Sequence, residues 1–156
     1  MRTTPVRDVM TTDVLTFKPS DSVESAARAL AERRLGGAPV VDDGGRVVGL
    51  LEDDDLILQE ARIHFPTVIS LLGAYLELPS SLHRFEHEVR KAVGATVADV
   101  MDADPPSCGE DDTLERVATL MHDRGLSRLP VVRDGRLVGI VARGDLVRAL
   151  VTLPEE

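Results

Sequence analysis

The sequence predicts an α/β (α+β) fold in which one βαββα unit occurs twice, with a helical insert between the two copies. Three observations lead to this prediction. The same motifs recur in the same order, each copy combines one helical pattern with two short strands, and a longer apolar segment separates the copies. We expect the first repeat at residues 1–60, the insert at residues 61–95 and the second repeat at residues 96–156.

Four pairs of motifs define the repeat. Their offset is 91 residues up to the Pro-Val-Val segment and 90 residues after it, so the second hairpin turn is one residue shorter. Chance does not reproduce both order and spacing over a whole folding unit. The pairs are Val6-Arg-Asp-Val-Met10 with Val97-Ala-Asp-Val-Met101, Ala38-Pro-Val-Val41 with Leu129-Pro-Val-Val132, Gly45–Leu51 with Gly135–Val141, and Asp55-Leu56 with Asp145-Leu146.

Each copy first predicts an amphipathic helix. Asp21-Ser22-Val23-Glu24 and Asp112-Thr113-Leu114-Glu115 are typical helix starts, with an aspartate near the N-cap and a glutamate in the first turn. Gly36-Gly37 and Gly125 are predicted to end the two helices. Apolar residues recur between these signals at helical spacing, namely Val23, Ala26, Ala27, Leu30 and Ala31 in the first copy and Leu114, Val117, Ala118 and Met121 in the second.

Two strands and a further helix follow in each copy. Residues 38–41 and 129–132 are short and rich in β-branched side chains, as are residues 47–51 and 137–141. Asp43-Gly44-Gly45 and Asp134-Gly135 supply the residues that a tight hairpin needs. The Asp-Leu pair then opens the last helix. A three-stranded sheet with helices on one face leaves apolar surface that the second copy can cover.

The insert is open to two interpretations. Its first part is apolar, Pro66 and Pro79 divide it, and Leu82–Val93 predicts an amphipathic helix. It either covers the core of the repeat pair or forms a surface for self-association or partner docking, because so much apolar area rarely stays exposed on a small monomer.

Composition excludes several classes of function. The net charge of −9 opposes nucleic-acid binding, and no apolar run reaches the roughly 18 residues that cross a membrane. No secretory signal and only one cysteine, Cys108, are present, which predicts a cytoplasmic protein without an internal disulfide. Cys108 lies in a sequence typical of a loop and is interpreted as a spectator thiol.

Catalytic and metal-binding motifs are absent from the sequence. No nucleophile elbow, phosphate-binding loop, Cys-x-x-Cys or His-Glu-x-x-His pattern occurs, so we expect no enzyme activity and no catalytic residue. His83 and His87 have a spacing that can chelate a metal, but Arg84 and Lys91 oppose a cation there. The histidines His64, His83, His87 and His122 are therefore interpreted as surface residues, with no metal site and no prosthetic group.

With this ordered set of motifs, occurring twice, the chain resembles a tandem pair of cystathionine β-synthase (CBS) domains, or Bateman module, as a stand-alone protein. The resemblance rests on Asp8-Val9-Met10 and Asp99-Val100-Met101, the two Pro-Val-Val segments, and Gly49-x5-Asp55-Leu56 with Gly139-x5-Asp145-Leu146. It implies a pseudo-twofold pair with two clefts that bind AMP, ADP, ATP or S-adenosylmethionine. It also implies a regulatory homodimer that acts on a protein partner the sequence does not identify.

The resemblance implies where a ligand binds. Asp55 and Asp145 would accept hydrogen bonds from ribose hydroxyls, and Arg128 stands where a relative carries a phosphate-binding arginine, with Arg143 nearby. We expect the Asp145 cleft to be the nucleotide site, with AMP as its ligand. The full set of expected ligand-binding residues is Met10, Thr11, Gly37, Ala38, Pro39, Asp55, Ser127, Arg128, Leu129, Pro130, Arg143 and Asp145.

The chain also departs from the family pattern. Glu52 and Ala142 stand where the family usually carries Ser or Thr, and Glu52-Asp53-Asp54-Asp55 places four carboxylates at the first cleft. Like charge there disfavours a polyphosphate, so AMP is preferred to ATP, and this first cleft is either empty or open to a cationic or metal-bridged ligand.

Simpler roles stand beside the ligand-binding ones. Asp55 and Asp145 could simply cap helices, and Arg128 and Arg143 could be solvated. Met10 and Met101 fit a core. A module with vestigial clefts that only contacts proteins is the alternative function.

Overall fold

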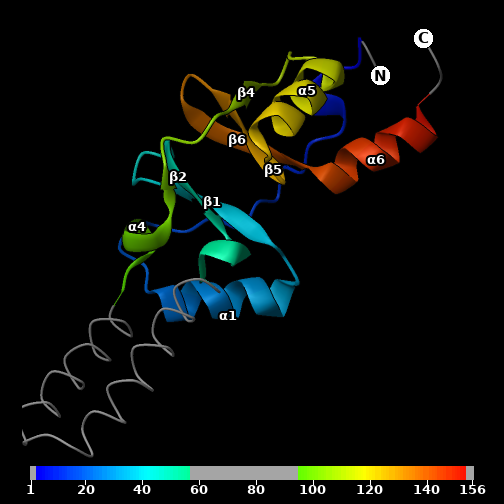
Figure 1. The fold of residues 1–156 in the computed structure, drawn as a ribbon. Coiled ribbons are helices and arrows are strands. Elements are labelled where there is room, and N and C mark those ends of the chain that lie inside the picture. Colours follow the sequence, from blue (N-terminus) through cyan, green and yellow to red (C-terminus); the bar gives the residue numbers. More distant parts are fainter. Residues whose placement is uncertain (1–2, 57–94, 154–156) are drawn as a thin grey trace, which may run out of the picture.

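The computed structural model describes residues 3–56 and 95–153 (Figure 1). The first repeat begins with a 3-10 helix η1 (Val6–Asp8), followed by α1 (Val23–Arg33), β1 (Gly37–Val41) and β2 (Val47–Glu52). Residues 53–56 are also helical. The two strands pair in antiparallel register, with Ala38 opposite Leu51. The predicted helix, strand, hairpin and strand are therefore confirmed in the first copy.

The second repeat has the same order of elements. A short helix α4 (Val97–Val100) and strands β3 (Asp102–Ala103) and β4 (Cys108–Gly109) lead into α5 (Leu114–Arg124). Then come β5 (Arg128–Arg133), β6 (Arg136–Ala142) and the last helix α6 (Arg143–Thr152). No helix within residues 3–56 and 95–153 is long and apolar enough to cross a bilayer.

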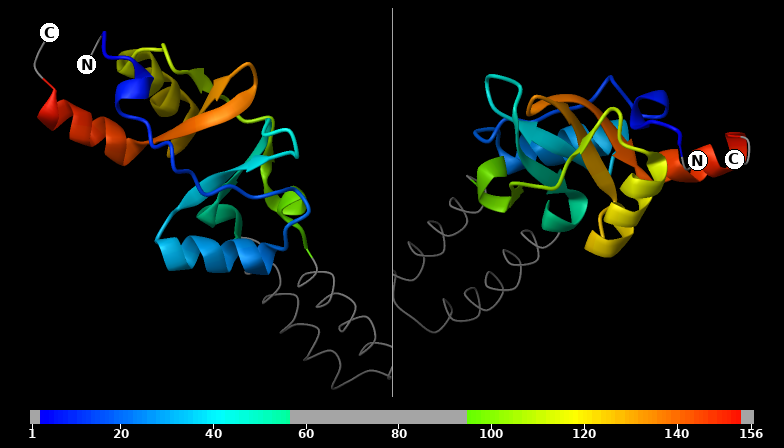
Figure 2. Two further views of the ribbon diagram at one scale, coloured as in Figure 1. Left: turned by 180° about the vertical axis from the view of Figure 1, so that it is seen from behind. Right: turned by 90° about the horizontal axis from the view of Figure 1, so that it is seen from above.

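Two three-stranded sheets form the centre, in the orders β1-β2-β3 and β4-β5-β6. Helix α1 covers one side of the first sheet, while α5 and α6 flank the second, so that the two sheets face each other in the middle of the molecule (Figures 1 and 2). The fold class predicted from the repeats is thereby confirmed.

The first segment of each repeat pairs with the other repeat. Strand β3 precedes α5 in sequence but extends the sheet of the first repeat, where Leu50 pairs with Asp102. In return, Thr11 exchanges two backbone hydrogen bonds of 2.9 Å with Ile140 in β6. The blue N-terminal segment accordingly lies beside the second repeat before it crosses to the first (Figure 2).

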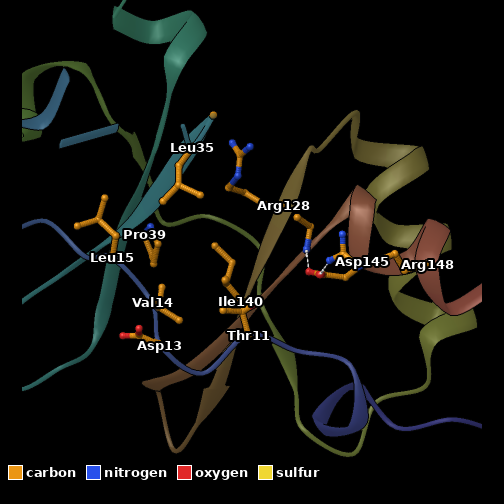
Figure 3. A pocket seen from close by; sticks show the side chains of 13 residues that line it. Thr11, Asp13, Val14, Leu15, Leu35, Pro39, Arg128, Ile140, Asp145 and Arg148 are labelled. Carbon is orange, nitrogen blue, oxygen red and sulfur yellow. Dashed lines mark hydrogen bonds and ion pairs between the residues drawn. The ribbon is translucent and has the colours of Figure 1, made fainter. Parts of the chain in front are cut away.

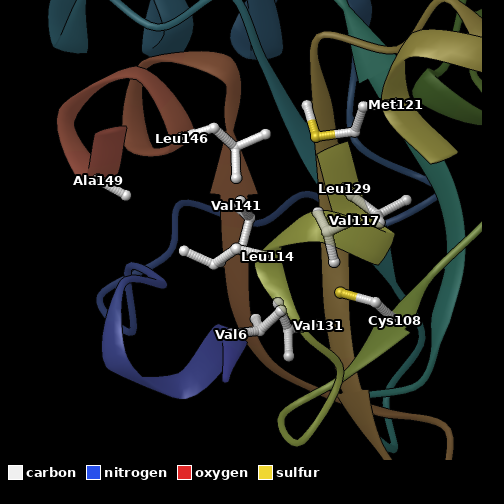
Figure 4. Packing of buried hydrophobic residues seen from close by; sticks show 10 residues of the cluster. All are labelled: Val6, Cys108, Leu114, Val117, Met121, Leu129, Val131, Val141, Leu146 and Ala149. Atoms are coloured by element: carbon white, nitrogen blue, oxygen red, sulfur yellow. The ribbon is translucent and has the colours of Figure 1, made fainter. Parts of the chain in front are cut away.

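Each core contains a valine supplied by the other repeat. Val6 is fully buried among the side chains of α5, β5 and β6 (Figure 4), and Val97 is fully buried in the cluster that contains Ala26 and Leu30 of α1. The backbone repeats this exchange, because the N–H of Val6 donates to Asp112 and the N–H of Val97 donates to Asp21, both at 2.8 Å. Neither repeat completes its core alone.

The first segment of each repeat contains a methionine that packs against a glycine of the other repeat. A Cβ atom on Gly139 would lie 2.7 Å from Sδ of Met10, and one on Gly49 would overlap Sδ of Met101. Met10 and Met101 therefore fill the space beside these glycines, as the packing role considered for them requires.

The predicted helix starts agree with the structure: Ser22 and Thr113, directly after the two aspartates, are the N-caps, and their hydroxyl oxygens accept from backbone N–H groups three residues on. Two local expectations need correction. Helix α1 ends before the predicted glycines, with Arg34 in the left-handed conformation. Ala31 is exposed, which narrows the buried stripe of α1. The second hairpin is one residue shorter, as predicted.

Candidate functional site

A cavity of about 250 Å³ lies between the two repeats, at the end of the molecule where α6 begins (Figure 3). Both repeats supply its walls, so its shape depends on how they pack. The wall residues are Thr11, Asp13, Val14, Leu15, Leu35, Gly36, Gly37, Pro39, Arg128, Ile140, Ala142, Asp145 and Arg148.

One side of this cavity is apolar. Val14 and Leu15 come from the extended N-terminal segment, Leu35 and Pro39 from the turn after α1 and from β1, and Ile140 from β6. In Figure 3 these side chains lie on the side away from Asp145 and Arg148, and the carboxylate of Asp13 lies beside Val14 on the same side. Leu35 is 43% exposed although it is large and apolar. Such a surface fits a flat apolar ring better than a sugar or a phosphate.

The opposite side carries Asp145, which is 8% exposed. Its Oδ2 accepts a hydrogen bond of 2.8 Å from the backbone N–H of Ala142 and so caps the start of α6. Its Oδ1 forms an ion pair with Arg148, one turn further along the helix (Figure 3). This carboxylate therefore both caps α6 and lines the cavity, with one oxygen bound to the backbone of Ala142 and the other paired with Arg148.

Arg128 begins β5 and adds a second cation to the wall. Its side chain is only 13% exposed and forms an ion pair with Glu52, whose side chain is 19% exposed, at the end of β2. Burial lowers the pKa of the Arg128 guanidinium below its usual value. Both arginines of the cavity are thus paired with carboxylates.

Comparison with known proteins identifies the fold family. The family model of the CBS domain matches residues 6–61 and again residues 97–152. The chain belongs to the CBS domain family. The tandem CBS pair inferred from the motifs is thereby confirmed, and each match covers one βαββα repeat.

Individual relatives extend this finding. The chain is 34% identical over 148 residues to the chloroplastic CBS domain-containing protein CBSX2 of Arabidopsis thaliana, covering 89% of this chain and 59% of the relative. It is 31% identical to YlbB of Bacillus subtilis, covering 92% of this chain and 80% of that one. The crystal structure of CBSX2 in complex with AMP superposes with a TM-score of 0.74 at 31% identity, over 96% of this chain and 97% of that one.

Five of the residues predicted for ligand binding lie in the wall of the cavity: Thr11, Gly37, Pro39, Arg128 and Asp145. The others lie elsewhere. Ala38, Leu129 and Pro130 are buried in the CBS cores, and Met10 packs on Gly139. Ser127 accepts a backbone hydrogen bond from Arg143, and the Arg143 side chain is exposed and donates to the carbonyl of Leu126.

The sequence prediction missed other wall residues. Arg148, rather than Arg143, is the arginine of α6 at this cavity. Its position three residues after Asp145 places it on the same helix face, and that spacing is a signal available in the sequence. Asp13, Val14, Leu15 and Leu35 lie in irregular segments without periodicity, and nothing in their local sequence marks them as wall residues.

The equivalent aspartate of the first CBS repeat has a different environment. Oδ2 of Asp55 accepts a hydrogen bond of 3.1 Å from the backbone N–H of Glu52, just as Asp145 accepts one from Ala142 at the start of α6. Burial, and then the charges of Asp102, Asp54 and Asp53, raise the pKa of Asp55 to about 6. The exchanged strand β3 thus adds Asp102 to the carboxylates that the sequence placed here.

Two further expectations concern other residues. Cys108 lies in strand β4 rather than a loop, is buried, and has a pKa raised to about 12, chiefly by burial, which makes its thiol unreactive. Among the described residues, no group of His, Cys, Asp or Glu could hold a metal ion. His64, His83 and His87 and the predicted insert helix Leu82–Val93 lie outside the described residues.

Proposed function

We propose that this CBS pair is a non-catalytic regulatory module that binds an adenosyl ligand, AMP above all, in the cavity beside Asp145. The observation that carries the proposal is the division of this cavity into a mostly apolar side, which also holds Asp13, and a side with Asp145, Arg128 and Arg148. This division matches the parts of a nucleoside monophosphate. The crystal structure of the relative CBSX2 in complex with AMP supports the choice of ligand.

Each part of AMP has a counterpart in the wall. The adenine ring would lie among Val14, Leu35, Pro39 and Ile140, whose apolar surfaces suit a flat aromatic ring. The ribose hydroxyls would donate to Asp145, since a carboxylate accepts from vicinal hydroxyl groups. The phosphate would lie toward Arg128. A ligand held in this way contacts both repeats and can change their relative orientation, which a partner protein then detects.

The assembly and the boundaries form part of the same proposal. We place the repeats at residues 1–60 and 96–156 with the insert at 61–95, which the matches at 6–61 and 97–152 support. A homodimer is supported by the exposed apolar side chains Val147, Leu150 and Val151 on α6, of which Val151 is 83% exposed. A cytoplasmic site of action belongs to the same proposal, and its argument is the single cysteine of the sequence.

The alternative function is a protein-interaction module whose clefts bind no ligand. One observation favours it. The groups that would hold ribose and phosphate, Asp145 and Arg128, are both already paired inside the protein. The cavity of about 250 Å³ is also slightly smaller than the range of roughly 300–1,000 Å³ of known ligand sites. The two functions differ in whether small molecules stabilise the fold.

Thermal unfolding with AMP, ADP, ATP, NAD or S-adenosylmethionine, each with and without Mg²⁺, distinguishes these functions. A ligand present at 100 times its dissociation constant adds about 2.7 kcal/mol to the free energy of unfolding. We expect AMP to stabilise the protein more than ATP does. If no ligand in this panel raises the melting temperature, the interaction module is the correct function.

A matched pair of variants tests the role of Asp145. Asp145→Asn keeps an oxygen that can cap α6 but lowers the ability to accept from ribose hydroxyls, so the stabilisation by AMP should disappear. Asp99→Asn is the control, because Asp99 accepts from the backbone N–H of Thr96 in the same way at α4 but lies outside the cavity wall. Asp99→Asn should bind AMP like the unchanged protein.

A further inference from the structure

The Arg128 guanidinium occupies a space that two glycines of the other repeat leave open. A Cβ atom on Gly36 would lie 2.7 Å from Nη2 of Arg128, and a Cβ on Gly37 would overlap Nη1. The same Cβ on Gly37 would lie 2.8 Å from Oε2 of Glu52. Any larger side chain at these positions would displace the ion pair between Arg128 and Glu52. The ion pair is therefore part of the packed contact between the two repeats.

This ion pair breaks the internal symmetry of the molecule. By the offset of the repeats, the equivalent of Arg128 is Gly37 and the equivalent of Glu52 is Ala142. The register shows the same relation, since Gly37 pairs with Glu52 across the first hairpin and Arg128 pairs with Ala142 across the second. The positions of Arg128 and Glu52 thus carry both charges, whereas the equivalent positions Gly37 and Ala142 carry none.

The geometry also relates Glu52 to the ligand cavity. Arg128 lies in the cavity wall, whereas its partner Glu52 lies outside the set of wall residues. A phosphate in the cavity would therefore share Arg128 with a carboxylate that is fixed by the fold. Two negative groups beside one guanidinium repel each other, and this cost grows with the charge that the ligand brings.

We infer that Glu52 is a specificity-determining residue of this CBS pair, which selects against phosphate charge by competing with the ligand for Arg128. The inference rests on the proposed function, because it concerns the same cavity. Neutral nucleosides do not compete for Arg128, AMP competes with one phosphate, and ATP competes with three. Glu52 thereby ranks adenosyl ligands by charge without contacting them.

Isothermal titration of the full chain and of Glu52→Gln with adenosine, AMP and ATP tests this inference. The glutamine keeps the shape of the side chain and an acceptor for Arg128 but removes the negative charge. We expect adenosine affinity to stay within about twofold, AMP affinity to rise about tenfold and ATP affinity to rise further. Asp54→Asn is the control, since it removes an exposed charge two residues away and should leave the ratio of AMP to adenosine affinity unchanged.

A second variant tests whether the effect passes through Arg128. In an Arg128→Gln background, Glu52→Gln should give no gain for AMP, because no cation remains to be shared. An equal gain in that background, or weaker AMP binding by Glu52→Gln alone, would overturn the inference.

The result also separates this inference from the proposed function. Binding of AMP with equal affinity by the unchanged protein and by Glu52→Gln leaves the proposed function intact and rejects the inference. If neither protein binds a nucleoside or nucleotide, the proposed function fails and inorganic phosphate decides the inference. Phosphate should then raise the melting temperature of Glu52→Gln but not that of the unchanged protein, and equal responses would reject the role of Glu52.

Discussion

Arg34 and Gly125 occupy the same position of the repeat, directly after α1 and α5. Both are left-handed, with φ of 54° and 63° respectively. Glycine adopts this conformation without a clash of a Cβ atom, whereas arginine does not. The two copies of one motif thus differ in local strain, and the first copy carries the less favourable residue.

Exchanging these residue types should change stability in opposite directions. We expect Arg34→Gly to raise the free energy of unfolding by about 0.5–1 kcal/mol and Gly125→Ala to lower it by about 1 kcal/mol. Urea denaturation of both variants measures the effect. Loss of stability in Arg34→Gly would mean that the arginine side chain contributes more than the strain costs.

Asp55 makes stability depend on pH in a defined direction. Its pKa is about 6 in the folded protein, above the ordinary aspartate value of 3.8, so the folded state holds this proton more tightly than the unfolded state. The contribution of Asp55 to stability is therefore greatest below about pH 4 and falls as the pH rises toward 6. Asp55→Asn should gain stability relative to the unchanged protein between pH 4 and pH 7, by about 1 kcal/mol for a partly exposed group.

Asp99 provides a control of opposite sign. Hydrogen bonds from the backbone and side chain of Thr96 lower the pKa of Asp99, so its ionised form stabilises the fold above the unfolded pKa and that contribution is lost as the pH falls. Asp99→Asn should therefore lose stability at pH 7 and recover toward pH 3. The same trend for both variants in chemical denaturation across this pH range would contradict the assigned environments.

At the scale of elements, the first segment of each repeat is part of the core of the other repeat. Val6 lies near the N-terminus, where side chains usually contribute little, yet it is fully buried against Leu114 and Val131 of the second repeat (Figure 4). Val97 has the equivalent place in the first repeat. Each segment thus holds the repeats together through apolar burial as well as through backbone pairing.

Truncation of these valines measures that contribution. Val6→Ala and Val97→Ala should each lower the free energy of unfolding by about 2 kcal/mol, because each leaves a cavity in a closed core. Thr12→Ala is the control, since Thr12 is exposed and should change stability by less than about 0.5 kcal/mol. A small effect of Val6→Ala in guanidinium denaturation would show that the N-terminal segment frays from the second repeat.

At the scale of the whole molecule, the sequence predicted what is local and periodic. The helices, the hairpins and the CBS pair followed from motifs with fixed spacing, and Asp145 and Arg128 were placed beside one cavity. The exchange of segments was not predicted, because β3 spans only Asp102–Ala103 and Thr11 pairs as a single bridge. Contacts of one or two residues leave no periodic pattern in a sequence.

The cavity was harder to predict than the fold for the same reason. Arg143 and Arg148 are both near Asp145 in sequence, and the spacing that places Arg148 on the same helix face as Asp145 becomes decisive only once the face of α6 that lines the cavity is known. The pairing of Arg128 with Glu52 joins residues 76 positions apart. This pairing depends on the space that Gly36 and Gly37 leave for Arg128, and that space can be recognised only when both repeats are placed together.

The reciprocal exchange of segments bears on how such a chain could have arisen. A shorter ancestor with a single repeat would have lacked the valine and the edge pairing that the other copy provides here. Two such chains could have supplied these to each other by swapping their first segments, giving a symmetric dimer of identical subunits. Duplication and fusion of its gene would join the two subunits in one chain and keep the exchange of first segments. Once both halves were encoded separately, the second could acquire Arg128 and the first Glu52. The resulting single, asymmetric ion pair cannot arise between identical subunits, in which every substitution appears twice.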